Sequence, residues 1–208
     1  MNLHLILTKV LMLPGIILGL SLHEFAHAWM SVRLGDPTPQ RQGRLTINPL
    51  AHIDWMGFIA LVLVGFGWGR PVQIDPRYYK HPRRDEFLVA IAGVTMNLII
   101  AVILSFPARA LESAYYTSGG SMIIENVYYI IMYAVMINLV LMIFNLIPCP
   151  PLDGWGIITQ IFKLDRYSWW YKVYQYGTWI LLILIVSNLT DIIITPAVTS
   201  LMRLLRVF

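Results

Sequence analysis

Residues 11–32 read LMLPGIILGLSLHEFAHAWMSV. His23, Glu24 and His27 interrupt an apolar run that is long enough to cross a lipid bilayer, which takes about 20 residues. One ionisable side chain at the centre of a bilayer costs ~2.5–3.5 kcal/mol on insertion scales. Three such groups in one span need a compensating partner, so the stretch indicates a membrane helix that carries a functional site.

The composition is that of an integral membrane protein. Of the 208 residues, 58% are hydrophobic and 12% are charged, whereas a soluble domain is about 45–50% apolar and about 25% charged. A single cysteine, Cys149, excludes an internal disulfide framework and a cysteine-based zinc finger. The net charge is +4, but the basic residues cluster between apolar segments. They therefore indicate membrane orientation and not nucleic-acid binding.

Three further segments are apolar enough to predict membrane helices, namely residues 87–106, 127–147 and 176–194. Residues 55–69, WMGFIALVLVGFGWG, are too short to span and are bounded by glycines. We expect them to form a re-entrant or interfacial segment within an insert of residues 42–74. The predicted fold is an all-α polytopic membrane protein with about four transmembrane helices. A short re-entrant or β-like insert lies between the first helix, residues 11–32, and the second.

The distribution of lysine and arginine predicts the orientation. Eight of these residues lie between Arg33 and Arg84, and three more lie in residues 163–172. Only Arg109 lies between the second and third helices, and few flank the two ends of the chain. The positive-inside rule places the two basic loops in the cytoplasm and both termini outside. We expect a multi-pass protein of the cell membrane.

His23, Glu24 and His27 form the pattern H-E-x-x-H. On a helix, residues four apart share one face, so both imidazoles can reach one metal ion. Neutral imidazole is a good zinc ligand. Glu24 points elsewhere and can take a proton from a water that the metal activates. The alternative is a hydrogen-bonded polar helix face, and the apolar surroundings favour the metal.

A third ligand is expected at Asp153 in the stretch NLIPCPPLDGWG, residues 145–156. Prolines break the helix there and can aim a side chain back into the bundle. The predicted topology brings Asp153 to the same cytoplasmic depth as His23 and His27. The alternative is an ordinary turn with a solvated aspartate. Cys149 is nearby, but we interpret it as a packing residue.

Other polar residues are weaker candidates. Asn97 can donate to the substrate carbonyl or its oxyanion, or it can link helices; both roles stay open. Asn145 can hold the substrate backbone or orient the broken segment, and the second role is favoured. His52 and Asp54 are best explained by a polar loop network.

Taken together, these motifs resemble the site-2 protease family of intramembrane zinc metalloproteases. That family pairs H-E-x-x-H with a later N-x-x-P-x-P-x-x-D-G, which is matched here by Asn145, Pro148, Pro150, Asp153 and Gly154. Residues 92–97, AGVTMN, resemble its middle-helix G-x-x-x-N element. The resemblance implies one zinc ion held by His23, His27 and Asp153, with Glu24 as the general base.

The resemblance also implies a single transmembrane protease domain over residues 1–208, of the minimal kind without a PDZ or CBS domain. Its partners would be the lipid bilayer and a transmembrane or membrane-embedded substrate, cleaved in regulated intramembrane proteolysis. A metal transporter or channel is a rival that explains ligands in a bilayer but not Glu24. A catalytically inactive helix-binding scaffold is a second rival, which the intact glutamate disfavours.

Overall fold

The computed structural model describes residues 3–64, 67–117 and 120–207. Its helices are α1 (Leu3–Arg33), α2 (Thr38–Arg41), α3 (Trp55–Val64), α4 (Pro82–Thr117), α5 (Met122–Asn145), α6 (Asp153–Phe162), α7 (Ser168–Val186) and α8 (Leu189–Leu204). Short 3-10 turns are η1 (Pro49–Ala51), η2 (Pro76–Tyr78) and η3 (Leu164–Arg166). No β-strand forms within these ranges, and the predicted all-α class is confirmed.

Three helices, α1, α4 and α5, are long and apolar enough to cross a membrane. A fourth span arises if α7 and α8 are counted together, although they meet at a bend of 70°. This agrees with the expected number of about four, but the single helix expected over residues 176–194 is wrong in one respect. The chain turns at Ser187 and Asn188, and Asn188 adopts a left-handed backbone with φ of 57°, which ends the regular helix.

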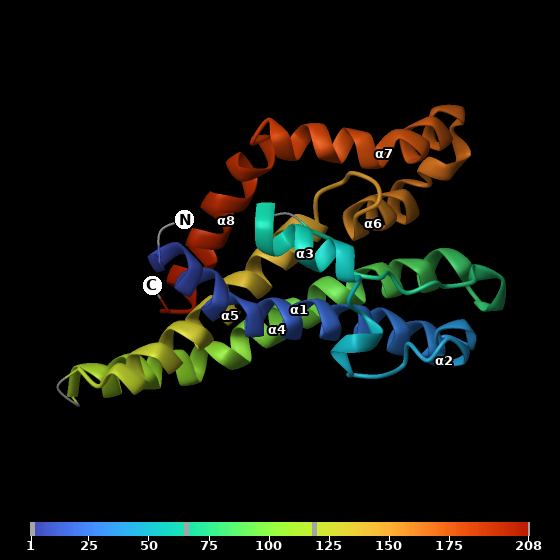
Figure 1. The fold of residues 1–208 in the computed structure, drawn as a ribbon. Helices are drawn as coiled ribbons and strands as arrows, with labels where there is room; N and C mark the ends of the chain where they lie inside the picture. The colour runs from blue at the N-terminus through green and yellow to red at the C-terminus, as the bar shows by residue number, and fades with distance from the viewer. Residues whose placement is uncertain (1–2, 65–66, 118–119, 208) are drawn as a thin grey trace.

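The bundle is built on α1, α4 and α5, which run alongside one another (Figure 1). Gly15 of α1 lies so close to α5 that a β-carbon there would be 2.6 Å from the Cα of Ala134. Small residues allow this approach of two helix backbones in a membrane. Helix α8 completes the packing through a buried apolar cluster that contains Val94, Ala101, Ala108, Val135, Leu139, Met142, Val198, Met202 and Val207.

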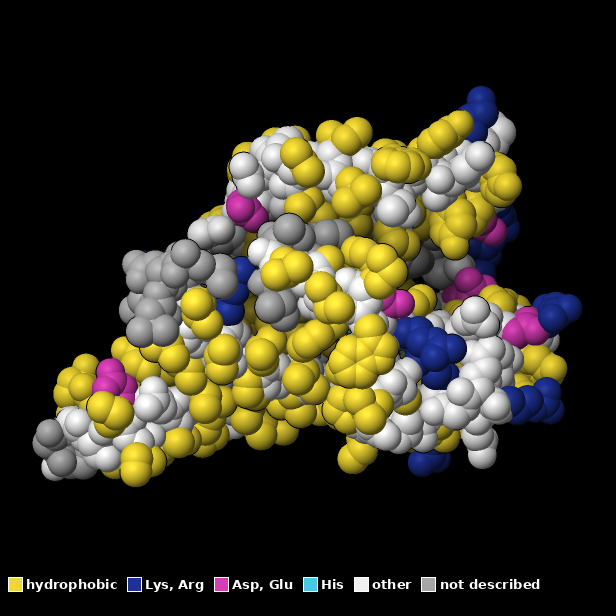
Figure 2. Space-filling view, viewed as in Figure 1, with side chains coloured by type: hydrophobic (Ala, Val, Ile, Leu, Met, Phe, Trp, Pro, Cys, Tyr) yellow, Lys and Arg dark blue, Asp and Glu magenta, His cyan; other side chains and the backbone are white. Residues whose placement is uncertain are grey.

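The outer surface is suited to lipid. Apolar side chains cover the middle of the face in Figure 2, and lysines and arginines gather toward the end where α2 and the start of α4 lie. Large side chains such as Ile103 and Leu63 are 60% and 70% exposed. Monomeric soluble proteins rarely expose large contiguous apolar patches. Together with its long apolar helices, this surface identifies an integral membrane protein.

The insert between α1 and α4 folds back on itself. The carbonyl of His52 accepts a hydrogen bond from Arg70 N–H at 2.8 Å, and Ile53 and Gly69 form an isolated antiparallel bridge. The two ends of the segment that contains α3 therefore lie side by side. The β-like part of the expectation reduces to that bridge. The buried His52 ring bonds to the carbonyl of Thr46 at 2.7 Å, in a polar loop network.

Asp36 ties the insert to the end of α1. Its fully buried carboxylate accepts hydrogen bonds from the Ser31 hydroxyl at 2.9 Å and from the backbone N–H groups of Thr38 and Asp75, both at 2.8 Å. Burial alone would raise the pKa of Asp36, but these hydrogen bonds outweigh it and hold the pKa below its ordinary value. The extended chain of residues 70–75 is thereby fixed at its far end.

We predict that Asp36→Asn destabilises the protein by about 1–3 kcal/mol. The amide N–H₂ of asparagine would replace one carboxylate oxygen and would face a hydroxyl or backbone N–H that now donates to that oxygen. A carboxylate with a lowered pKa contributes its stability above the unfolded-state pKa of about 3.9, so the loss should be equal at pH 7 and pH 5. Unfolding in detergent measures it. The exposed Asp191→Asn is the control, and equal stability of the two variants would contradict the assignment.

Candidate active site

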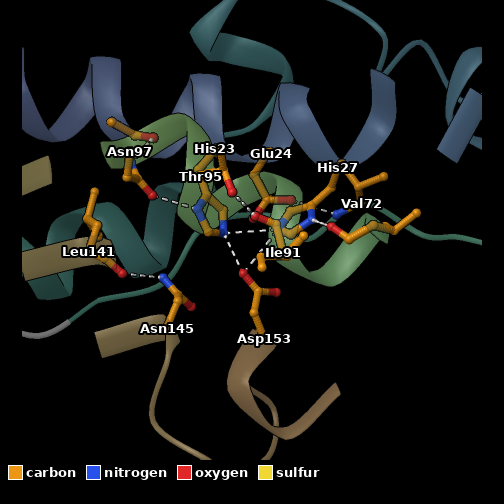
Figure 3. A network of polar contacts seen from close by, with 12 residues as sticks. His23, Glu24, His27, Val72, Ile91, Thr95, Asn97, Leu141, Asn145 and Asp153 are labelled. Carbon is orange, nitrogen blue, oxygen red and sulfur yellow. Dashed lines mark hydrogen bonds and ion pairs between the residues drawn. The ribbon is translucent and has the colours of Figure 1, made fainter. Parts of the chain in front are cut away.

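Three side chains converge on one point between α1 and α6. His23 and His27 project from α1 toward Asp153, the first residue of α6 (Figure 3). The two Nε2 atoms are 3.0 Å apart, and Asp153 Oδ2 lies 3.2 Å from that of His23 and 3.3 Å from that of His27. The structure therefore brings the two histidines of the first motif and the aspartate of the second together, as the sequence predicted. The three side chains lie close enough to hold a metal ion.

Hydrogen bonding determines which nitrogen of His27 carries the proton. His27 Nδ1 is 2.7 Å from the backbone carbonyl of Val89 on α4. A carbonyl oxygen only accepts, so Nδ1 must donate. In the neutral form that binds a metal, the lone pair of Nε2 therefore faces Asp153.

Asn97 determines the proton position of His23 in the same way. Its Nδ2 donates to the carbonyl of Gly19 at 3.2 Å and to Oδ1 of Asn138 at 3.0 Å. Its Oδ1 is left to accept from His23 Nδ1 at 2.7 Å. Asn138 is oriented in turn by donating to the carbonyl of Ala134 at 2.8 Å. A buried amide relay across α1, α4 and α5 thus fixes the ring that faces the site.

This arrangement fits a zinc ion. Two imidazole lone pairs and a carboxylate oxygen face one another, and Asp153 Oδ2 is buried without a hydrogen-bond donor among the described residues. Uncompensated lone pairs in a buried site are costly, and a cation between them removes the cost. Two histidines and one acidic residue are a known zinc donor set, and three protein ligands leave a position for water or substrate.

Two glycines make the convergence possible. A β-carbon on Gly93 of α4 would lie 2.6 Å from Cε1 and 2.7 Å from Nε2 of His23, and it would also meet His27. A β-carbon on Gly154 would run into the carbonyl groups of Leu146 and Ile147. Gly93 therefore leaves room for the imidazoles, and Gly154 lets the start of α6 fold back against the end of α5.

Glu24 lies beside the three residues and lines the same cavity, which has a volume of about 530 Å³. It is half-buried, and its Oε2 accepts a hydrogen bond from the backbone N–H of Val72 at 2.9 Å. Val72 belongs to the extended chain of residues 70–75, which includes the last residues of the insert (Figure 3). Only one carboxylate oxygen is engaged in this contact, so the other stays available for chemistry in the cavity.

The weaker candidates separate in the structure. Asn97 is fully buried with both polar atoms engaged behind His23, which supports a positioning role and leaves nothing to contact a substrate oxyanion. Asn145 lines the cavity and donates to the carbonyl of Leu141 at 2.9 Å. The described metal-binding group includes neither His52 nor Cys149.

Sequence reasoning missed Asn138 and Val72. Asn138 is one polar residue in an apolar helix, with no motif around it. Val72 acts through its backbone N–H, so its side chain carries no signal.

We predict that Gly93→Ala lowers the zinc content of the purified protein by at least tenfold, because the added methyl group takes the place of the imidazoles. Metal analysis in detergent measures it. Gly156→Ala on α6 is the matched control, since its β-carbon would meet that of Ala90 at 3.4 Å, an ordinary contact, and zinc should be retained. Full zinc in Gly93→Ala would contradict the geometry.

The sequence of the chain is similar to that of known proteins. A family model described as Peptidase family M50 matches residues 107–188. A protein of Bacillus subtilis (strain 168) named "Putative zinc metalloprotease YwhC" is 36% identical over 185 residues, which cover 89% of this chain and 84% of the relative.

A protein of Mycolicibacterium smegmatis named "Putative zinc metalloprotease Rip2" is 28% identical over 187 residues, which cover 86% of this chain and 67% of the relative. The search of solved structures gave no significant match. The similarity to the Bacillus relative extends over most of both chains, and the chain belongs to peptidase family M50, the site-2 protease family of zinc metalloproteases.

Proposed function

We propose that this zinc metalloprotease hydrolyses peptide bonds of transmembrane or membrane-embedded substrates, in the manner of regulated intramembrane proteolysis. One observation carries the proposal. Two of the three metal-binding side chains, His23 and His27, lie on a buried face of α1, which is apolar enough to span the bilayer. The cavity beside them is lined in part by the spanning helices α1, α4 and α5. A substrate segment in the same membrane can reach such a cavity without leaving the lipid.

We assign His23, His27 and Asp153 as the zinc ligands and Glu24 as the general base. When bound, zinc polarises the scissile carbonyl and makes water a better nucleophile near neutral pH. Glu24 accepts the proton of the attacking water and returns it to the leaving amine. The Val72 N–H orients the carboxylate during this transfer. Asn145, at the wall of the cavity, is a candidate contact for the substrate backbone.

The alternative hypothesis of a metal transporter or channel has less support. Permeation through a membrane needs polar residues along the whole path. Among the described residues, one metal-binding group is found, and its three members lie together between α1 and the start of α6. A carboxylate beside the ligands, held by a backbone N–H, suits proton transfer better than ion passage.

The proposed roles of Glu24 and Asp153 predict different effects of their substitution on zinc content. Glu24→Gln keeps the size and the hydrogen-bond acceptor but loses the proton acceptor, so it should retain near-stoichiometric zinc and lose cleavage by at least ~10²–10⁴-fold. Asp153→Ala removes a ligand and should lower both zinc and cleavage. Metal analysis of the purified variants, together with comparison of membrane-protein fragments in cells with wild type or Glu24→Gln, decides the matter. Zinc lost from Glu24→Gln but kept in Asp153→Ala would reverse the roles.

We further propose that the site faces the cytoplasmic side of the cell membrane, with both termini outside, and that residues 1–208 act as one protease domain. In a Cys149→Ala background, a cysteine at exposed Thr117 should react with an impermeant thiol reagent added to intact cells, and a cysteine at exposed Arg77 should not. Labelling in the opposite pattern would overturn the orientation.

A further inference from the structure

Arg44 is a buried cation that the proposed reaction does not use. The residue is only 4% exposed, although it lies in a loop, where arginine is usually exposed to solvent. One nitrogen, Nη2, donates to the carbonyls of Arg70 and Pro71, the latter at 2.9 Å. Burying a guanidinium is costly unless its contacts compensate, so these contacts indicate that the arginine serves a purpose beyond solubility.

The two carbonyls that Arg44 holds directly precede Val72, whose N–H donates to Glu24. Burial lowers the pKa of Arg44, and electrostatic attraction by the Glu24 carboxylate offsets part of that effect. The extended chain is therefore fastened to Arg44 on one side of Val72 and to Asp36 through the Asp75 N–H on the other. Between these two anchors, the position of the Val72 N–H is fixed relative to the carboxylate.

We propose that Arg44 is a positioning residue of the hydrolytic site, which acts through the backbone of residues 70–72 to hold the Val72 N–H against Glu24. This rests on the proposed function of Glu24 as the base. Arg44 Nη1 has no hydrogen-bond partner among the described residues, so the backbone contacts of Nη2 carry the interaction. Lysine can also present one nitrogen to such a pair of carbonyls, but its flexible side chain fixes the geometry less well, so it is a partial substitute.

The first measurement does not require catalysis. Hydrogen–deuterium exchange of the full-length protein in detergent should be at least tenfold faster at the Val72 N–H in Arg44→Met than in wild type, because that N–H is the one held against Glu24. Arg44→Lys should be intermediate, and the exposed Arg41→Met, a matched loss of charge, should match wild type. Zinc content should be equal in all four proteins, because the ligands lie on α1 and α6. Unchanged exchange in Arg44→Met would overturn the proposal.

The second measurement is kinetic and uses a substrate that wild type cleaves and Glu24→Gln does not. Arg44→Met should lower kcat by about 10- to 100-fold, the range for a misplaced catalytic group, with KM changed less than twofold. Val72→Pro removes the same N–H directly and should have a similar effect. Because both act through one contact, the double variant should be no slower than Val72→Pro alone.

The proposal would be contradicted if the fold-losses of kcat in the two single variants multiplied in the double variant. It would also be contradicted if kcat fell only in proportion to lost zinc. If Arg44→Met does not accumulate as folded protein, Arg44→Lys alone and combined with Val72→Pro gives the same comparison. If no substrate of wild type is found, the proposed protease function fails while the exchange result still decides whether Arg44 holds the chain at Glu24.

Discussion

Two imidazole nitrogens and one carboxylate oxygen present lone pairs to one another inside an apolar helix bundle, and the rest of the structure is arranged around that constraint. A metal cation at its centre would offset the cost of burying these three groups together. The contact requires α4 to approach α1 without a side chain at Gly93, and it requires the chain after α5 to turn back so that Asp153 begins α6. The close approach at Gly93 and the turn before α6 are therefore requirements of one site.

The polar groups behind the site are hydrogen-bonded to one another and to the backbone of the helices. Asn97 and Asn138 use amides and backbone carbonyls on three helices, and His27 uses the carbonyl of Val89. Hydrogen bonds between membrane helices contribute modestly to stability, about 0.6 kcal/mol on average. Stability alone is thus a weak explanation for the relay. Its consequence for His23, a fixed proton on Nδ1 and a free Nε2, is the stronger one.

The residues proposed as ligands and base could be picked out from the sequence, because their chemistry resides in side-chain identity and spacing, and the structure brings the three proposed ligands together. His23, Glu24 and His27 stand out as charges in an apolar run, and Asp153 stands out after a proline-broken helix. The break between α7 and α8 was not predictable, since hydropathy runs on across Ser187 and Asn188 while the turn depends on a backbone angle. Hydrogen bonds through a backbone N–H, such as that of Val72, leave no trace in composition at all.

The two parts of the chemistry rest on different supports. The three metal-binding side chains come from helices α1 and α6, which are held by close helix packing, whereas the partner of Glu24 comes from an extended chain fastened by side chains to backbone. Helix packing is stiff, and a chain of a few residues between two anchors is less so. Metal affinity and orientation of the base can therefore change independently in this fold. In the proposed function the insert contributes no ligand, but it acts on the reaction through Glu24, the residue proposed to move the proton.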